Sequence, residues 1–102
     1  YNGTLILARA AHFLKDYDAA ERFYQHQVEL ANKVKSGPKM VAAYDGLIDL
    51  YWDAKRFADV IETCENVVDM KGPAELENAK PFVLERLIQA TAKQGKTDMA
   101  LN

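Results

Sequence analysis

An all-α fold is predicted by three features of the sequence, in the form of an α-solenoid of antiparallel helical hairpins with about two and a half repeats. Apolar residues recur every three or four positions, as on one side of a helix, and no segment alternates with a period of two for long enough to predict a strand. The pattern repeats every 40 residues, and each period holds two helices. The length of 102 residues fits one domain, residues 1–102.

Breaks in this pattern divide the chain into five helices and part of a sixth. The strongest breaks are Ser36-Gly37-Pro38 and Lys71-Gly72-Pro73, because glycine tolerates a left-handed helix ending and proline does not continue a helix. Together with Gly95 in a weaker break, these glycines are each expected to end a helix. The expected helices are 3–15, 18–35, 39–54, 57–70 and 78–94, with another from about 97, which gives repeats 3–37, 38–77 and 78–102.

The start of the fifth helix is placed by Pro81. Proline is tolerated in the first turn of a helix, but further in it removes a backbone hydrogen bond. Asn78 is therefore the expected N-cap, and residues 73–77 can add a helical turn before it.

The 40-residue repeat also predicts which side chains are buried. The first helix of each repeat carries one stripe of residues on the same side. In the middle repeat this stripe is Tyr44, Leu47, Ile48 and Tyr51, and a shift of 40 residues gives Leu84, Leu87, Ile88 and Thr91 in one direction and Thr4, Leu7, Ala8 and Ala11 in the other. In the second helices the stripe is Phe57, Val60, Cys64 and Val67, which corresponds to Tyr17, Ala20, Tyr24 and Gln27. One hairpin cannot bury its stripe alone, so neighbouring hairpins are expected to cover all of these residues.

Composition narrows the partner classes. Apolar residues make up 49% of the chain and charged residues 27%, as in a soluble globular domain. A net charge of −2 gives no long-range attraction to nucleic acid or an anionic membrane, and no apolar run is long enough to span a bilayer. The single cysteine, Cys64, excludes an internal disulfide and slightly favours the cytoplasm. Because the chain starts at Tyr1 rather than at Met, we expect a fragment or a processed product.

Residues 16–25, Asp-Tyr-Asp-Ala-Ala-Glu-Arg-Phe-Tyr-Gln, resemble the turn and second helix of the tetratricopeptide repeat family. Residues 56–61 and 95–100 are the second and third copies. The period of 40 exceeds the family's usual 34 and resembles the longer repeat of kinesin light chains. Ile48, Ile88, Gln27 and Val67 depart from the family pattern, which has small residues at these positions.

The resemblance implies a binding scaffold whose first helices line a concave groove for a peptide or a partner segment. Some members of the family clamp a chaperone's C-terminal carboxylate with Lys and Asn. Here Leu5, Arg9 and Gly46 occupy those positions, so a chaperone-tail receptor is disfavoured.

The expected groove is centred on Asp49 and Trp52. Asp45, Asp49 and Asp53 lie on one side of a helix at four-residue spacing, where like charges destabilise the helix by a few tenths of a kcal/mol per pair. One interpretation is an acidic strip that receives Lys or Arg from a partner, with Trp52 as an aromatic anchor. The alternative is internal neutralisation by Arg9 and Lys93. The full set of groove residues expected is Arg9, His12, Phe13, Asp45, Asp49, Trp52, Asp53, Phe82, Glu85, Gln89 and Lys93.

Two further alternatives remain for this surface. Trp52 and Phe13 can instead pack against their own turns, and the three aspartates could hold a divalent cation, although fixed helical spacing suits this poorly.

Enzymatic chemistry is not expected. His12 and His26 fall on different helices without metal-ligand spacing around them, and Cys64 belongs to an apolar stripe. No glycine-rich phosphate loop is present, so we expect no catalytic residues, metal or cofactor. Two functions compete with peptide binding: a structural spacer that self-associates through its uncapped C-terminal repeat, and the regulatory arm of an enzyme encoded outside this sequence.

Overall fold

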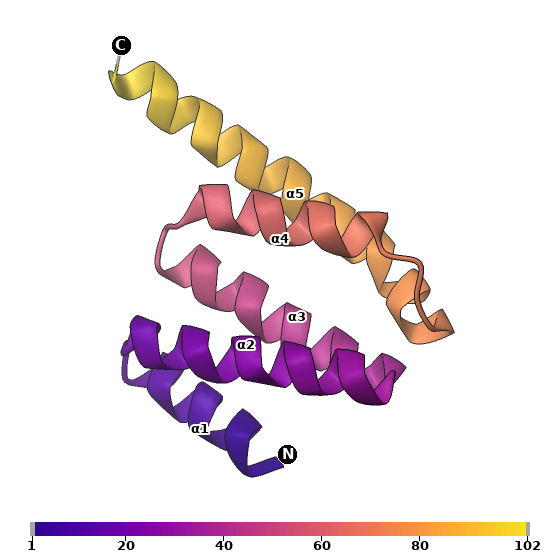
Figure 1. The fold of residues 1–102 in the computed structure, drawn as a ribbon. Helices are drawn as coiled ribbons and strands as arrows, with labels where there is room; N and C mark the ends of the chain where they lie inside the picture. Colours follow the sequence, from indigo (N-terminus) through magenta and orange to yellow (C-terminus); the bar gives the residue numbers. More distant parts are fainter. Residues whose placement is uncertain (1, 102) are drawn as a thin grey trace.

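The computed structural model describes the backbone of residues 2–101 and the side chains of residues 6–95. This part of the chain folds into α1 (Asn2–Phe13), α2 (Tyr17–Val34), α3 (Gly37–Asp53), α4 (Phe57–Asp69) and α5 (Ala74–Leu101), and contains no strand. The helices follow one another in chain order, with α1 at one end and α5 at the other (Figure 1). α1 packs on α2 and α3 packs on α4, while α5 packs on α4 and α3. The all-α prediction is confirmed.

The first three connections close in the same way. Lys15, Lys35 and Lys55 adopt left-handed backbone angles, with φ of 62°, 54° and 60°. The N–H of the following residue then donates to the carbonyl five residues before it, at 2.8 to 3.3 Å. This helix ending usually employs glycine. The prediction that Gly37 ends a helix is therefore wrong, because Lys35 takes the left-handed position and Gly37 begins α3.

Side-chain caps fix where the next helices begin. Asp16 Oδ1 accepts a hydrogen bond from the N–H of Ala19 at 3.3 Å, and Ser36 Oγ accepts one from the N–H of Lys39 at 3.4 Å. Each bond satisfies a backbone donor that has no partner within its own helix.

The core lies where the hairpins meet, and it divides into two clusters. The larger cluster joins α1 to α5 and contains Ala8, Ala20, Tyr24, Leu47, Ile48, Leu50, Tyr51, Val60, Cys64 and Ala90. The smaller cluster contains Ala31, Met40, Val67 and Leu76. The predicted burial of the second-helix stripes is confirmed for Ala20, Tyr24, Gln27, Val60, Cys64 and Val67. Tyr17 and Phe57, which begin these stripes, are half-buried.

α5 departs most from the prediction. It begins at Ala74 and continues to Leu101, so Asn78 is not its N-cap, Pro81 lies inside it, and neither Gly95 nor residues 94–97 end it. The early start buries Leu76 in the smaller cluster, which contributes about 1.5–3 kcal/mol and offsets most of the ~3 kcal/mol cost of an internal proline. Without the expected turn, no separate sixth helix forms within residues 2–101.

Several residues of the predicted first-helix stripes are exposed. Leu7, Leu84, Ile88 and Thr91 face solvent, contrary to the prediction, whereas Leu87 packs against the core. α5 continues to Leu101 without the expected turn, so within the described residues no returning helix covers Leu84 and Ile88. Thr4, and the side chains of residues 96–100 that carry the third copy of the motif, lie outside the described ones.

Candidate functional site

The predicted groove residues lie on α1, α3 and α5, but the structure divides them among three hollows. Asp45 and Phe82 line a hollow between α3 and α5. The largest predicted group lies where α1 meets the end of α3 and consists of Arg9, His12, Phe13 and Asp53. A third hollow is lined by Trp52, Gln89 and Lys93. Two predicted residues line none of these three hollows: Glu85, which is exposed on α5, and Asp49, which is half-buried on α3.

The first hollow, which we call the α3–α5 depression, has a volume of about 280 Å³. Its lining is mainly apolar and consists of Val41, Tyr44, Ile48, Val67, Leu76, Ala79, Phe82 and Val83, together with Asp45 and Arg86. Phe82 is 74% exposed, so its ring projects from the rim with most of its surface open to water. An apolar surface of this kind is suited to receiving an apolar side chain.

Arg86 organises the centre of this surface. Its Nη2 donates a hydrogen bond to Asp49 Oδ1 at 3.0 Å, and its guanidinium lies 4.8 Å from the centroid of the Trp52 ring. The Trp52 ring also meets Phe57 edge to face at 5.2 Å, across the turn between α3 and α4. Trp52 is thus half-buried by its own turn and by α5, rather than open as an anchor.

The pKa of Asp49 is raised above its ordinary value. Partial burial is the main cause, the charge of Asp45 adds to it, and Arg86 offsets part of the effect. The acidic strip is therefore neutralised within the molecule at Asp49, by Arg86 instead of the predicted Arg9. Asp45 remains exposed at the edge of the α3–α5 depression.

His12 lies at the α1 end of this surface and contacts the last residue of α3, Asp53. Its Nε2 lies 2.6 Å from Asp53 Oδ2, an ion pair whenever the imidazole is protonated. The hollow beside it is more polar and is lined by Arg9, His12, Phe13, Lys15, Tyr17, Tyr24 and Asp53. Phe13 is 86% exposed, so it does not pack against its own turn as the alternative interpretation required.

The third hollow is small and is lined by Trp52, Gln89, Ala92 and Lys93. It continues the same side of α5 beyond Arg86.

Sequence reasoning missed Arg86. Phe82, Arg86, Gln89 and Lys93 are spaced by four, three and four residues and share one side of α5, with Arg86 at its centre and Glu85 at its edge. Helical spacing counted from Phe82 would have selected Arg86 over Glu85.

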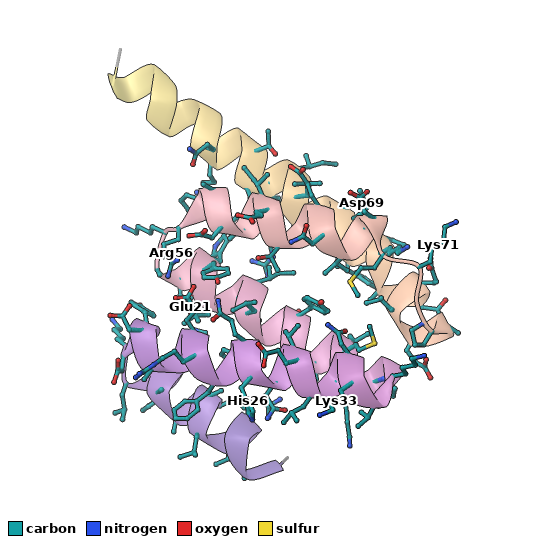
Figure 2. All side chains as sticks on the ribbon, in the orientation of Figure 1. Glu21, His26, Lys33, Arg56, Asp69 and Lys71 are labelled. Atoms are coloured by element: carbon teal, nitrogen blue, oxygen red, sulfur yellow. The ribbon has the colours of Figure 1, made fainter. Side chains whose placement is uncertain are left out.

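A polar cluster outside this surface fixes the turn between α3 and α4. Glu21 of α2 accepts hydrogen bonds from the Tyr51 hydroxyl and from Arg56, whose Nη2 lies 3.2 Å away (Figure 2). Arg56 also binds Asp59 at 2.7 Å and lies over the Tyr51 ring. Burial alone would raise the pKa of Glu21, but the hydrogen bonds from Tyr51 and Arg56 lower it below its ordinary value.

Two observations concern reactive and metal-binding side chains among the described residues. Cys64 is fully buried, and burial raises the pKa of its thiol to about 11, which keeps it protonated. Among the described side chains, no group of three or more His, Cys, Asp or Glu residues is arranged to hold a metal ion. None of the described helices is both long and apolar enough to cross a membrane.

Comparison with known proteins gives no identification: no protein-family model matches the chain, and no match was found among curated proteins or among solved structures.

Proposed function

We propose that this chain is a protein-interaction module that holds a segment of another protein across the α3–α5 depression. The observation that carries the proposal is an apolar hollow with an exposed aromatic ring, Phe82, on one side and a carboxylate, Asp45, on the other. Such a surface suits a ligand with an apolar side chain next to a lysine or arginine.

The apolar hollow and the Asp45 carboxylate would contribute different amounts to the free energy of binding. Burying a Leu or Phe side chain of the ligand would contribute about 1.5–3 kcal/mol. An ion pair with the exposed Asp45 would add about 0–1 kcal/mol. The apolar contact therefore supplies most of the affinity, while Asp45 mainly determines orientation and selects basic sequences.

The resemblance of residues 16–25 to the tetratricopeptide repeat family supports the proposal. In that family the first helix of each repeat lines the groove, and the corresponding helices here are α1, α3 and α5. We therefore also propose that the helices form a solenoid of hairpins and that the chain belongs to the tetratricopeptide repeat family.

The test is selection of ligands from a random peptide library, followed by measurement of their Kd by fluorescence anisotropy. We expect selected peptides to pair an apolar residue with Lys or Arg. Phe82→Ala should weaken binding about tenfold, which corresponds to ~1.4 kcal/mol. Phe82 is a better probe than Trp52, because the Trp52 ring packs on Phe57 and its removal would also destabilise the fold.

Asp45→Asn should reduce the preference for basic peptides and leave the apolar requirement intact. Val34→Ala is the matched control, since Val34 is exposed on α2 and does not line the depression. Peptides whose affinity is unchanged by both Phe82→Ala and Asp45→Asn would place the binding site elsewhere and refute the proposal.

A further inference from the structure

The polar hollow between α1 and the end of α3 has the largest volume of the three hollows, about 590 Å³. We call it the α1–α3 hollow. Volumes of ~300–1,000 Å³ are typical of sites that bind small ligands. The proposed function uses the α3–α5 depression and makes no use of this hollow. Its lining comes from α1, the turn after it, α2 and the end of α3, and consists of Arg9, His12, Phe13, Lys15, Tyr17, Tyr24 and Asp53.

Tyr24 brings to this hollow a hydroxyl that lacks a protein partner among the described residues. The residue is only 3% exposed, yet no described side chain or backbone group forms a hydrogen bond with its hydroxyl. Buried tyrosine hydroxyls normally have a hydrogen-bond partner. Burial raises the pKa of Tyr24, and the charge of Arg9 lowers it in part, so the hydroxyl stays protonated within reach of the Arg9 charge. It is therefore a donor for a molecule that enters the hollow.

His12 holds the tyrosine rings of the lining in place. Its imidazole meets the ring of Tyr17 edge to face at 6.4 Å between centroids, and the ring of Tyr24 at 6.3 Å. His12 Nε2 also lies 2.6 Å from Asp53 Oδ2. Asp53 is the only acidic residue among the described side chains that line the hollow. The Tyr24 donor is thus positioned before a ligand arrives, and the carboxylate of the lining already has a partner.

Two cations of the lining are available to an anion. Neither Arg9 nor Lys15 forms an ion pair with a carboxylate of the described side chains. Their like charges favour the entry of an anion between them. Of the acidic residues on α3 that oppose an anion, Asp49 is bound by Arg86 at 3.0 Å, and Asp45 is exposed, where water screens its charge.

We propose that the α1–α3 hollow binds a phosphate monoester, presented by a phosphorylated side chain of the partner segment. Such a group carries a charge of about −1.5 to −2 near neutral pH and three acceptor oxygens. Arg9 and Lys15 match this charge, and together with the Tyr24 hydroxyl they offer a donor to each oxygen. A carboxylate has one charge and two oxygens, so it would leave one of these donors unused. Only the source of the phosphate rests on the proposed function.

NMR titration of the isotope-labelled protein tests the site with two probes that share a phenyl ring, phenyl phosphate and benzoate. We expect phenyl phosphate to shift the amide signals of residues 9–17 and to bind about tenfold more tightly than benzoate, because it makes one more charge-assisted hydrogen bond. Arg9→Gln should weaken phenyl phosphate binding by about tenfold for the same reason.

Tyr24→Phe separates a role in binding from a role in the fold. It should weaken phenyl phosphate binding by about fivefold through the loss of one donor. It should not lower the urea midpoint of unfolding, because no described residue forms a hydrogen bond with the hydroxyl that it removes. Lys33→Gln is the matched control for Arg9→Gln, since Lys33 is an exposed cation of α2 outside the hollow, and this variant should bind as the wild type does.

Peptides selected for the α3–α5 depression test the source of the phosphate. Each is extended with a serine at successive positions, in phosphorylated and unphosphorylated form. We expect phosphorylation at the position that reaches the hollow to lower the Kd by about tenfold, and Arg9→Gln to remove this gain. A library that yields no peptide would refute the proposed function, whereas the phenyl phosphate titration would still decide whether the site exists.

Several results would overturn the proposal. Phenyl phosphate that does not bind would do so, as would binding that Arg9→Gln and Tyr24→Phe leave unchanged. Benzoate that binds as tightly as phenyl phosphate would assign the hollow to carboxylates. Phosphopeptides that bind no more tightly than their unphosphorylated forms would exclude a phosphorylated side chain as the ligand. So would vesicles of phosphatidic acid that bind through Arg9 more tightly than any phosphopeptide, because the phosphate would then come from a lipid.

Discussion

Gly46 and Gly95 both lie inside helices, yet replacing each with alanine should have opposite effects on stability. Alanine is about 1 kcal/mol more favourable than glycine within a helix. A Cβ on Gly95 would meet no atom within 4 Å, so Gly95→Ala should raise the free energy of unfolding by about 1 kcal/mol. A Cβ on Gly46 would lie 2.8 Å from Tyr24 Cδ1 and 2.9 Å from Cζ, with Cε1 closer still.

The Tyr24 ring cannot readily move aside. It is 3% exposed and belongs to the larger core cluster, between α2 and α3. Overpacking of a core costs about 1–3 kcal/mol. After the gain in helix propensity is subtracted, Gly46→Ala should lower the free energy of unfolding by up to about 2 kcal/mol.

Urea unfolding followed by circular dichroism measures both variants. The decisive control is the Tyr24→Ala background, in which the clash is absent and Gly46→Ala should become stabilising by about 1 kcal/mol. If Gly46→Ala stabilises the wild type as much as Gly95→Ala does, then α2 and α3 do not approach each other as described.

Four further predictions concern other parts of the molecule. Lys55→Gly should raise the midpoint of thermal unfolding, because glycine adopts the left-handed backbone without the ~1–2 kcal/mol cost of an L-residue. Part of this gain is offset, since glycine also increases the conformational entropy of the unfolded chain. An unchanged midpoint would argue against backbone strain at Lys55. Glu21→Gln should destabilise at neutral pH, since the lowered pKa of Glu21 stabilises the fold above the unfolded-state pKa, and the effect should vanish as the pH falls through the folded-state pKa. Asp49→Asn should instead stabilise the fold at neutral pH, because the raised pKa of Asp49 means that its ionisation opposes folding, and this gain in stability should shrink as the pH falls. Urea midpoints at several pH values test both carboxylate variants. Midpoints that change in the same direction for the two variants would contradict the pKa shifts of Glu21 and Asp49. Cys64 should react with a thiol reagent at the rate of unfolding, and rapid labelling of the native protein would show that it is accessible.

The hairpin part of the fold could be predicted from the sequence because two signals agree. The aromatic residues Tyr17 and Phe57 are 40 residues apart and begin α2 and α4, as predicted to within one residue. The stripes that follow them are buried as expected, since each lies between two neighbouring helices. Periodicity and turn position point to the same arrangement, which makes the prediction robust.

The course of α5 could not be predicted because single proline and glycine residues are weak evidence for where a helix begins or ends. Pro81 and Gly95 each disfavour a helix interior, by about 3 and 1 kcal/mol. Burial of Leu76 against α2, α3 and α4 is a long-range gain that sequence spacing does not reveal. The candidate site was predicted in part for the same reason: spacing placed Asp49 and Trp52 on one side of α3, but their partner Arg86 comes from a different helix.

The similar left-handed turns at Lys15 and Lys55 bear on how this molecule could be lengthened. Residues 17–56 begin just after the turn at Lys15 and finish just after the turn at Lys55. In a tandem duplication of this segment, the turn at Lys55 would be followed by a second copy of α2 in place of α4, and both helices normally follow a turn of this kind. The inserted hairpin would add a nearest-neighbour interface, and the longer protein should unfold at a higher urea concentration. The α4–α5 connection offers no such junction, because Met70 is extended there and α5 is held by side chains such as Lys80, which donates to the Met70 carbonyl.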